Sequence, residues 1–201
     1  MSIKNQFMDR RIVKSKKAMK SALITLMREK ELKEISVSDI VRLADINRGT
    51  FYKHYQYVED ILNEMTDEVI TELTDSYREP YKNKEVFELN QLTTSAIKVF
   101  DHILKYADFY SLMVQSKTLA GFQHRFCSVI KDLTLNDLKD SLPKPQINRE
   151  LHVSYQAYAM LGLVLEWING GFKYSSSYMA EQLLELIKQK QSNTTFKTSI
   201  S

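Results

Sequence analysis

The chain has 201 residues, of which 43% are hydrophobic and 26% are charged, a balance that suits a soluble protein with a packed core. It contains only five glycines and three prolines, far fewer than turn-rich β architectures need, so the composition favours a helical protein. A single cysteine, Cys127, excludes an internal disulfide, and no apolar run reaches the roughly 20 residues of a membrane span. We therefore expect a cytoplasmic protein with no membrane anchor and no secretion signal.

Charge is distributed unevenly along the chain. Residues 1–56 carry a net charge of +7, whereas residues 57–201 carry −4. A basic head on a mildly acidic body is typical of a protein whose head meets a polyanion such as nucleic acid. A basic but merely solvated surface is the alternative.

Hydrophobic periodicity predicts an all-α protein of about nine helices with no strand. Pro80 ends the fourth helix, Gly170 and Gly171 end the eighth, and the polar tail 192–201 is expected to be disordered. The predicted helices span residues 10–30, 37–44, 48–55, 58–79, 86–105, 108–116, 119–141, 147–169 and 177–190.

The stretch from Ile35 to Tyr55 has the pattern of a helix-turn-helix. Ser36 and Asp39 are placed to cap the first short helix, a tight turn follows at Asp45, and Asn47 caps the second helix. The predicted exposed positions of that second helix are hydrogen-bond donors, a ring and a glycine, without a carboxylate to repel phosphate: Arg48, Gly49, Thr50, Tyr52, Lys53 and His54. Glycine inside a helix costs about 1 kcal/mol relative to alanine, so this glycine indicates close approach of the backbone to DNA.

Residues 11–62 resemble the DNA-binding domain of the TetR family of transcriptional regulators. The likeness rests on Ser36–Ile40, on Ala44, on the block Arg-Gly-Thr-Phe-Tyr-Lys-His-Tyr at 48–55, and on Glu59–Leu62. It implies a three-helix DNA-binding domain over residues 1–57 and a helical ligand-binding and dimerisation domain over residues 58–191. Residues 106–113, 162–171 and 177–181 resemble a Gram-positive subgroup that includes dihydroxyacetone-kinase operon regulators.

The resemblance also implies a set of DNA contacts. Arg48 and Thr50 are the candidates for base readout, and the other members hold phosphates or let the backbone approach: Lys14, Lys17, Ser36, Ser38, Gly49, Tyr52, Lys53 and His54. Two positions depart from the family pattern. Asp45 stands where the family usually has glycine, but aspartate tolerates left-handed geometry, and Val58 stands where the family usually has a phosphate-binding lysine.

The larger domain offers candidates for an effector pocket, with plain core packing as the alternative for each of them: Tyr106, Phe109, Tyr110, Met113, Phe122, Phe126, Tyr155, Tyr158 and Trp167. His124 and Cys127 share a helix face, but a structural zinc site needs about four ligands, so we expect neither a metal nor a cofactor. The helices at 147–169 and 177–190 suit a four-helix bundle across a two-fold axis, which predicts a homodimer.

These observations predict a ligand-responsive repressor that acts as a homodimer on a palindromic operator, with double-stranded DNA and a small-molecule effector of unknown identity as partners. The alternative is a helical protein-binding adaptor, or an activator with weak DNA binding. We do not expect an enzyme, because the sequence lacks a nucleophile with its base, a phosphate-binding glycine loop and a metal pair.

Overall fold

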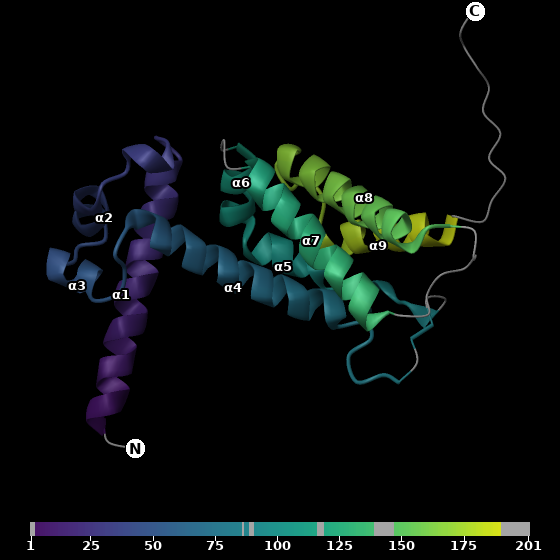
Figure 1. Cartoon of the computed structure of the whole chain (residues 1–201), viewed down its shortest axis with the longest axis horizontal. Helices are drawn as coiled ribbons and strands as arrows, with labels where there is room; N and C mark the ends of the chain where they lie inside the picture. Colours follow the sequence, from purple (N-terminus) through teal and green to yellow (C-terminus); the bar gives the residue numbers. More distant parts are fainter. Residues whose placement is uncertain (1–2, 86, 89–90, 116–118, 139–146, 190–201) are drawn as a thin grey trace, which may run out of the picture.

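The computed structural model describes residues 3–85, 87–88, 91–115, 119–138 and 147–189. Over these ranges the chain forms nine α-helices and two short 3₁₀ helices and no strand, which confirms the all-α prediction (Figure 1). The elements are α1 (Ile3–Met27), η1 (Leu32–Glu34), α2 (Val37–Leu43), α3 (Arg48–Tyr52), α4 (Val58–Arg78), η3 (Thr94–Ala96), α5 (Val99–Lys105), α6 (Ala107–Gln115), α7 (Leu119–Asp137), α8 (Arg149–Asn169) and α9 (Ser176–Gln189).

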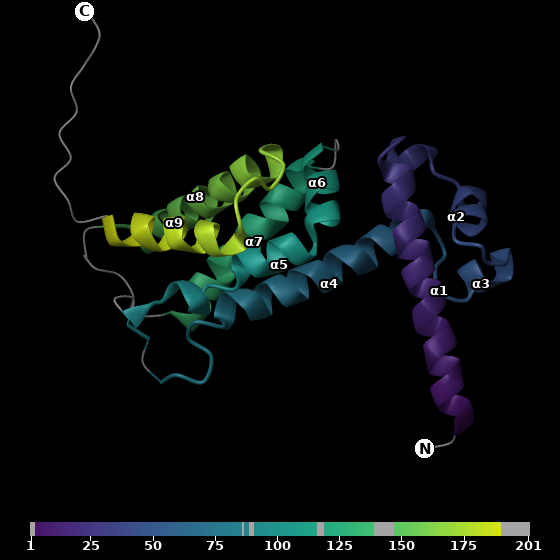
Figure 2. The ribbon, with the colours of Figure 1, turned by 180° about the vertical axis from the view of Figure 1, so that it is seen from behind.

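The helices form a small head and a larger body, which α4 joins. Helices α1 to α3 lie together at one end, and α4 runs from them along the body made by α5 to α9 (Figures 1 and 2). Within the head, α1 packs against α2 and α4; within the body, α7 packs along α8, α5 along α9, and α4 against both α5 and α7. Helix α4 begins at Val58 and packs against both parts, and the domain boundary between residues 57 and 58 stays a prediction.

The predicted helix over residues 86–105 is confirmed over residues 99–105 and is wrong over the described residues before them. Residues 94–96 form the 3₁₀ helix η3, Ile97 is extended, and the α-helix begins only at Val99. The hydroxyls of Thr93 and Ser95 lie 3.2 Å apart, and side chains of this type favour local hydrogen bonds over a continuous helix. Helix α1 starts earlier than predicted, at Ile3, and α3 ends earlier, at Tyr52. The predicted tail 192–201 lies outside the described residues.

A single hydrophobic cluster extends along α4 from the head into the body. Ile61 in the head half of α4 and Leu73 in its body half are both fully buried. In the body, Trp167 lies with its ring 5.7 Å from that of Phe100, and its Nε1 donates to the carbonyl of Tyr174 at 3.0 Å. The core of the head and the core of the body are therefore continuous through α4.

Candidate nucleic-acid interface

The first helix of the helix-turn-helix, α2, is fixed by a reciprocal cap. Asp39 N donates to the Ser36 hydroxyl at 3.2 Å, and Ser36 N donates to Asp39 Oδ2 at 3.0 Å, as the sequence predicted. Lys30 also donates to Asp39 at 2.8 Å, and this bond, together with those from Ser36, holds the pKa of the Asp39 carboxyl well below its usual range. The carboxylate therefore keeps its charge and its contacts across the physiological pH range.

The turn between α2 and α3 depends on a residue with positive φ. Asp45 has φ of 51°, which confirms that aspartate takes the left-handed geometry expected at this position. Ile46 N donates to the Val41 carbonyl at 3.0 Å and closes the turn. The direction in which α3 leaves α2 is therefore set by backbone geometry.

Helix α3 presents one face to solvent and packs the other. Phe51 is fully buried and Tyr55, just beyond the helix, is 4% exposed, so both anchor α3 in the head. The predicted contact residues of this segment all reach the surface. Thr50 and His54 are half-buried, and the other four are exposed, namely Arg48, Gly49, Tyr52 and Lys53. An alanine methyl at Gly49 would meet no atom within 4 Å, so packing within the chain does not require glycine there.

The basic residues of α1 divide into two groups. Lys14 and Lys17 are exposed, as are Ser36 and Ser38 on α2 and its cap. Lys16 and Lys20 instead turn towards α4 and pair with Glu64, each at 2.7 Å.

Glu64 collects these contacts at the centre of the head. It also accepts a hydrogen bond from the Tyr55 hydroxyl at 3.2 Å, and Lys20 reaches Glu68 at 2.6 Å. This network ties α1, the end of α3 and α4 to one another.

Sequence reasoning missed Arg10 and Arg11, which are both exposed on α1. The signal was present, because Arg10, Lys14 and Lys17 follow the four- and three-residue spacing of one helix face. Among the side chains of the head that the structure describes, which begin at residue 10, six cations have no carboxylate partner, namely Arg10, Arg11, Lys14, Lys17, Arg48 and Lys53.

The start of α4 carries no cation. Val58 is 5% exposed and belongs to the core, so the residue that replaces the family's usual lysine supports packing. Asp60 Oδ2 accepts from the backbone N–H groups of Gln56 and Tyr57, each at 2.8 Å. The Tyr57 side chain is 58% exposed beside these occupied amides.

In the body, the structure brings most of the predicted aromatic residues together. The Phe122 ring lies 5.7 Å from Phe109, 5.5 Å from Tyr110 and 6.4 Å from Phe126. Met113 is buried on the same helix as Phe109. Tyr106 lies at the edge, where its hydroxyl donates to Glu72 at 2.5 Å.

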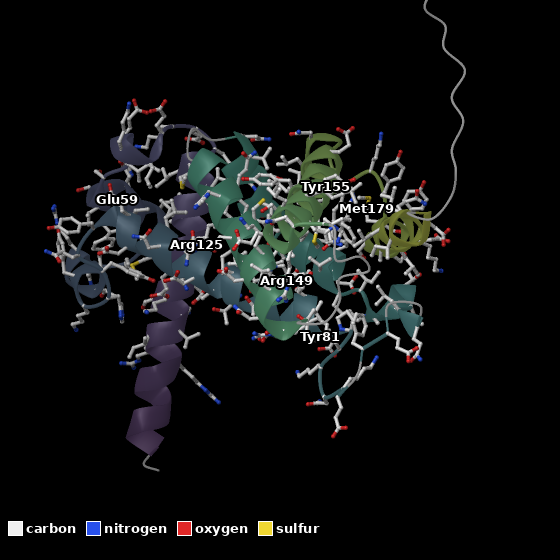
Figure 3. All side chains as sticks on the ribbon, turned by 45° about the vertical axis from the view of Figure 1, so that its right-hand side comes forward. Glu59, Tyr81, Arg125, Arg149, Tyr155 and Met179 are labelled. Carbon is white, nitrogen blue, oxygen red and sulfur yellow. The ribbon has the colours of Figure 1, made fainter. Side chains whose placement is uncertain are left out.

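Three of the predicted pocket residues lie elsewhere. Trp167 is buried against Phe100 and Phe172. Tyr155, which is labelled in Figure 3, and Tyr158 are 64% and 57% exposed on α8. Helix α8 is apolar on two faces, so its periodicity alone did not indicate which face points inward.

Sequence reasoning did not place His102, which the structure buries on α5 at 5% exposure. Its Nε2 lies 3.0 Å from the Tyr110 hydroxyl, and burial lowers its pKa to about 4. It lines an open cleft of about 380 Å³ between α4 and α5 together with Glu72, Asp75, Ser76, Glu79, Lys98, Asp101 and Lys105. An isolated histidine in a helical pattern carries no sequence signal for such a position.

The two residues that share a helix face, His124 and Cys127, differ in burial. His124 is exposed, whereas Cys127 is 2% exposed and burial raises the pKa of its thiol. Among the described residues, no three His, Cys, Asp or Glu side chains are grouped so that they could hold a metal ion. No helix in the described ranges is both long enough and apolar enough to cross a membrane.

Comparison with known proteins shows that the chain is similar to transcriptional regulators. Residues 90–189 match the family model TetR_C_8, described as the C-terminal region of transcriptional regulators. The chain is 22% identical over 179 residues to the "Uncharacterized HTH-type transcriptional regulator YxbF" of Bacillus subtilis (strain 168), an alignment that covers 86% of this chain and 44% of the relative. The chain thus spans less than half the length of that curated relative.

Solved structures share the fold. The "Dihydroxyacetone kinase operon activator DhaS" superposes with a TM-score of 0.60 at 21% identity, over 87% of this chain and 94% of that one. A TetR transcriptional regulator from Streptococcus agalactiae 2603V gives a TM-score of 0.60 at 20% identity, over 91% and 98% of the two chains. The solved structures show a shared fold, and the family-model match over residues 90–189 shows that the chain belongs to the TetR family of transcriptional regulators.

Proposed function

We propose that the protein binds operator DNA in a sequence-specific manner, with α3 in the major groove. The observation that carries this proposal is the exposed face of α3, which offers donors and an open glycine while Phe51 and Tyr55 hold the helix from behind. In a helix-turn-helix the N-terminal residues of the second helix contact base edges. Lys14, Lys17 and Lys53 then supply the positive charge that phosphates attract, and Ser36 and Ser38 supply neutral donors to phosphates.

The protein acts as a homodimer through α8 and α9. Leu151, Tyr155 and Tyr158 are 71%, 64% and 57% exposed and share a face of α8 with the exposed Gly162, whereas the opposite face is buried in the core. Leu186 and Tyr178 expose further apolar surface on α9. An apolar face that includes a glycine suits self-association about a two-fold axis, and such a dimer reads a palindrome whose half-sites lie about 34 Å apart.

An effector bound in the body regulates the spacing of the two heads. Helix α4 is held to the body by Lys105, which pairs with Glu72 at 2.5 Å, and by Arg125 of α7, which pairs with Asp67 (Figure 3). Arg28, just beyond α1, pairs with Asp108 of α6 at 2.7 Å. A ligand that binds unequally to two arrangements of these helices shifts the population between two dimer geometries, and release of the operator then relieves repression.

The test of DNA binding is selection of bound sequences from a random duplex library, followed by affinity measurements with a Gly49→Ala variant. Alanine at this open helical site should raise folding stability by about 0.5–1 kcal/mol and yet weaken operator binding, because its methyl occupies the space that the DNA backbone or bases approach. Gly121→Ala is the matched control, since Gly121 also lies in a helix with nothing within 4 Å of an added methyl. If no sequence is enriched by the folded protein, or if Gly49→Ala binds as tightly as Gly121→Ala, the proposed interface is wrong.

The dimer is tested separately by sedimentation velocity. Tyr158→Glu places a charge in the exposed apolar face of α8 and should shift the protein from dimer to monomer, whereas Ser95→Glu, an exposed change on η3, should not. If the wild-type protein is a monomer at micromolar concentration, the proposed homodimer is wrong. That result would not affect the test of DNA binding.

A further inference from the structure

Two exposed side chains of α3 hold each other in a defined arrangement. Arg48 Nη2 donates to the Tyr52 hydroxyl at 3.3 Å, and the guanidinium carbon lies 5.7 Å from the centre of the Tyr52 ring. The two residues are four apart in the helix, a spacing that places them on neighbouring turns of one face. Tyr52 remains 52% exposed, so the pair stands on the surface of the head.

The core of the head supports this pair from below. The Tyr52 ring meets the Phe51 ring edge-on, with 5.3 Å between centres and 85° between planes. Phe51 is fully buried, so its position is fixed by packing. The order of contacts therefore runs from an immobile core ring, through a half-exposed ring, to a guanidinium that points to solvent.

The described partners of Arg48 include no carboxylate, as is also true of Arg149, which donates to two backbone carbonyls. Arg28, Arg42, Arg78 and Arg125 each pair with a carboxylate, whereas Arg48 has a neutral hydroxyl and a ring. One hydroxyl uses only one of its five N–H donors. The remaining donors form a charged, planar fork that is held in place but still needs acceptors.

We propose that Arg48 reads a guanine in each half-site and that Tyr52 is the residue that positions it. This inference rests on the proposed function, because it assumes that α3 lies in the major groove. Guanine presents O6 and N7 there as two adjacent acceptors, and the arginine fork matches them with two parallel hydrogen bonds. A side chain that is already oriented loses less conformational freedom on binding, so a supported Arg48 discriminates better than a mobile one.

The proposal assigns Tyr52 a role different from that of a phosphate anchor. An anchor contributes the same factor to every DNA sequence, whereas a positioning residue affects only the base pair that Arg48 reads. The two roles therefore separate in a discrimination ratio, which is the affinity for the selected operator divided by the affinity for a duplex with one base pair changed.

The experiment measures this ratio by fluorescence anisotropy at each half-site position, for wild type, Arg48→Ala, Tyr52→Ala, Tyr52→Phe and the Arg48→Ala/Tyr52→Ala double variant. All of these changes are at exposed positions, and circular dichroism checks the fold. Arg48→Ala should abolish a preference of roughly 5- to 150-fold at one G·C pair. Tyr52→Ala should lower the preference at that same pair several-fold, have no further effect on it in the Arg48→Ala background, and be partly rescued by Tyr52→Phe, which keeps the ring.

Lys53→Ala is the matched control. It should weaken binding to all duplexes by one common factor, reduce the salt dependence and leave the discrimination ratio unchanged. A uniform loss with Tyr52→Ala that adds to that of Arg48→Ala would make Tyr52 a phosphate anchor and overturn the proposal. The proposal would also be overturned if Arg48→Ala changed the discrimination ratio at none of the half-site positions. Failure of the wild-type protein to select any sequence would instead refute the proposed function itself. The selection experiment is done before the variants are measured, so the two failures are distinguishable.

Discussion

The buried histidine of the body makes stability depend on pH in a defined direction. His102 is 5% exposed, and burial lowers its pKa from 6.5 to about 4, while neighbouring Glu72 acts against this and Lys105 acts with it. As pH falls below 6.5, the unfolded chain takes up a proton that the folded chain does not accept until about pH 4. The folded state is therefore penalised progressively over this interval. Linkage between these two pKa values gives a loss of about 2 kcal/mol between pH 7 and pH 5 from this one residue.

The assay is urea unfolding at pH 7, 6 and 5, followed by the fluorescence of Trp167, the sole tryptophan of the chain and a buried side chain in contact with Phe100 on α5. Protein concentration is held constant, because self-association would also change apparent stability. His102→Gln keeps an amide that can pair with the Tyr110 hydroxyl but does not titrate. Between pH 7 and pH 5 the free energy of unfolding of wild type should fall by about 2 kcal/mol more than that of His102→Gln. Any pH dependence that the two proteins share cancels in this difference.

His124→Gln removes an exposed histidine from α7 and serves as the control, which should keep the pH dependence of wild type. The reasoning is refuted if wild type and His102→Gln lose the same stability between pH 7 and pH 5. In that event the imidazole would be accessible to protons in the folded state, and the closed contact with Tyr110 would not describe the protein in solution.

Three further predictions concern the core, the turn and the charge of the head. Phe126→Ala removes a fully buried ring beside Phe122 and should lower the free energy of unfolding by about 3–5 kcal/mol in urea titrations; a loss below about 1 kcal/mol would show that the cluster is loosely packed. Asp45→Gly should raise stability by about 0.5–1 kcal/mol, because Asp45 has φ of 51°, and Asp45→Val should lower it; equal melting temperatures for the two variants would contradict the left-handed turn. Lys17→Ala should reduce the slope of log K against log salt by about 1 per protomer, whereas Lys16→Ala should reduce it less, because Lys16 is already paired with Glu64 at 2.7 Å; the opposite order would show that the pair breaks on DNA.

The head could be predicted well because its signals are local. The Ser36–Asp39 cap and the left-handed turn at Asp45 each depend on residues within a few positions of one another. The exposed side of α3 followed from placing Phe51 and Tyr55 inward, and both are buried. Such short-range features can be predicted from the local sequence without knowledge of any tertiary contact.

The body could be predicted less well because its helices meet residues distant in sequence. Leu92, Ala96 and Phe100 have helical spacing, but the hydroxyl-rich segment between them forms only a short 3₁₀ helix. On α8, the stripe of Tyr155 and Tyr158 was assigned both to a pocket and to a dimer face, and its exposure is compatible with the second of these positions only. Periodicity identifies an apolar face, but the partner of that face comes from the tertiary structure.

The charge of the head shows the same limit at the level of single residues. Lys16 and Lys17 are adjacent in the sequence and contribute equally to the net charge of +7 over residues 1–56. In the helix they point about 100° apart, so one reaches Glu64 on α4, 48 residues away, and the other faces solvent. The carboxylate that neutralises Lys16 lies beyond residue 56, which means that the segment count overstates the charge available to a ligand. The six cations that have no carboxylate partner among the described side chains of the head lie on α1 and at α3, the elements proposed to follow the groove, and we expect them to contribute most to DNA binding.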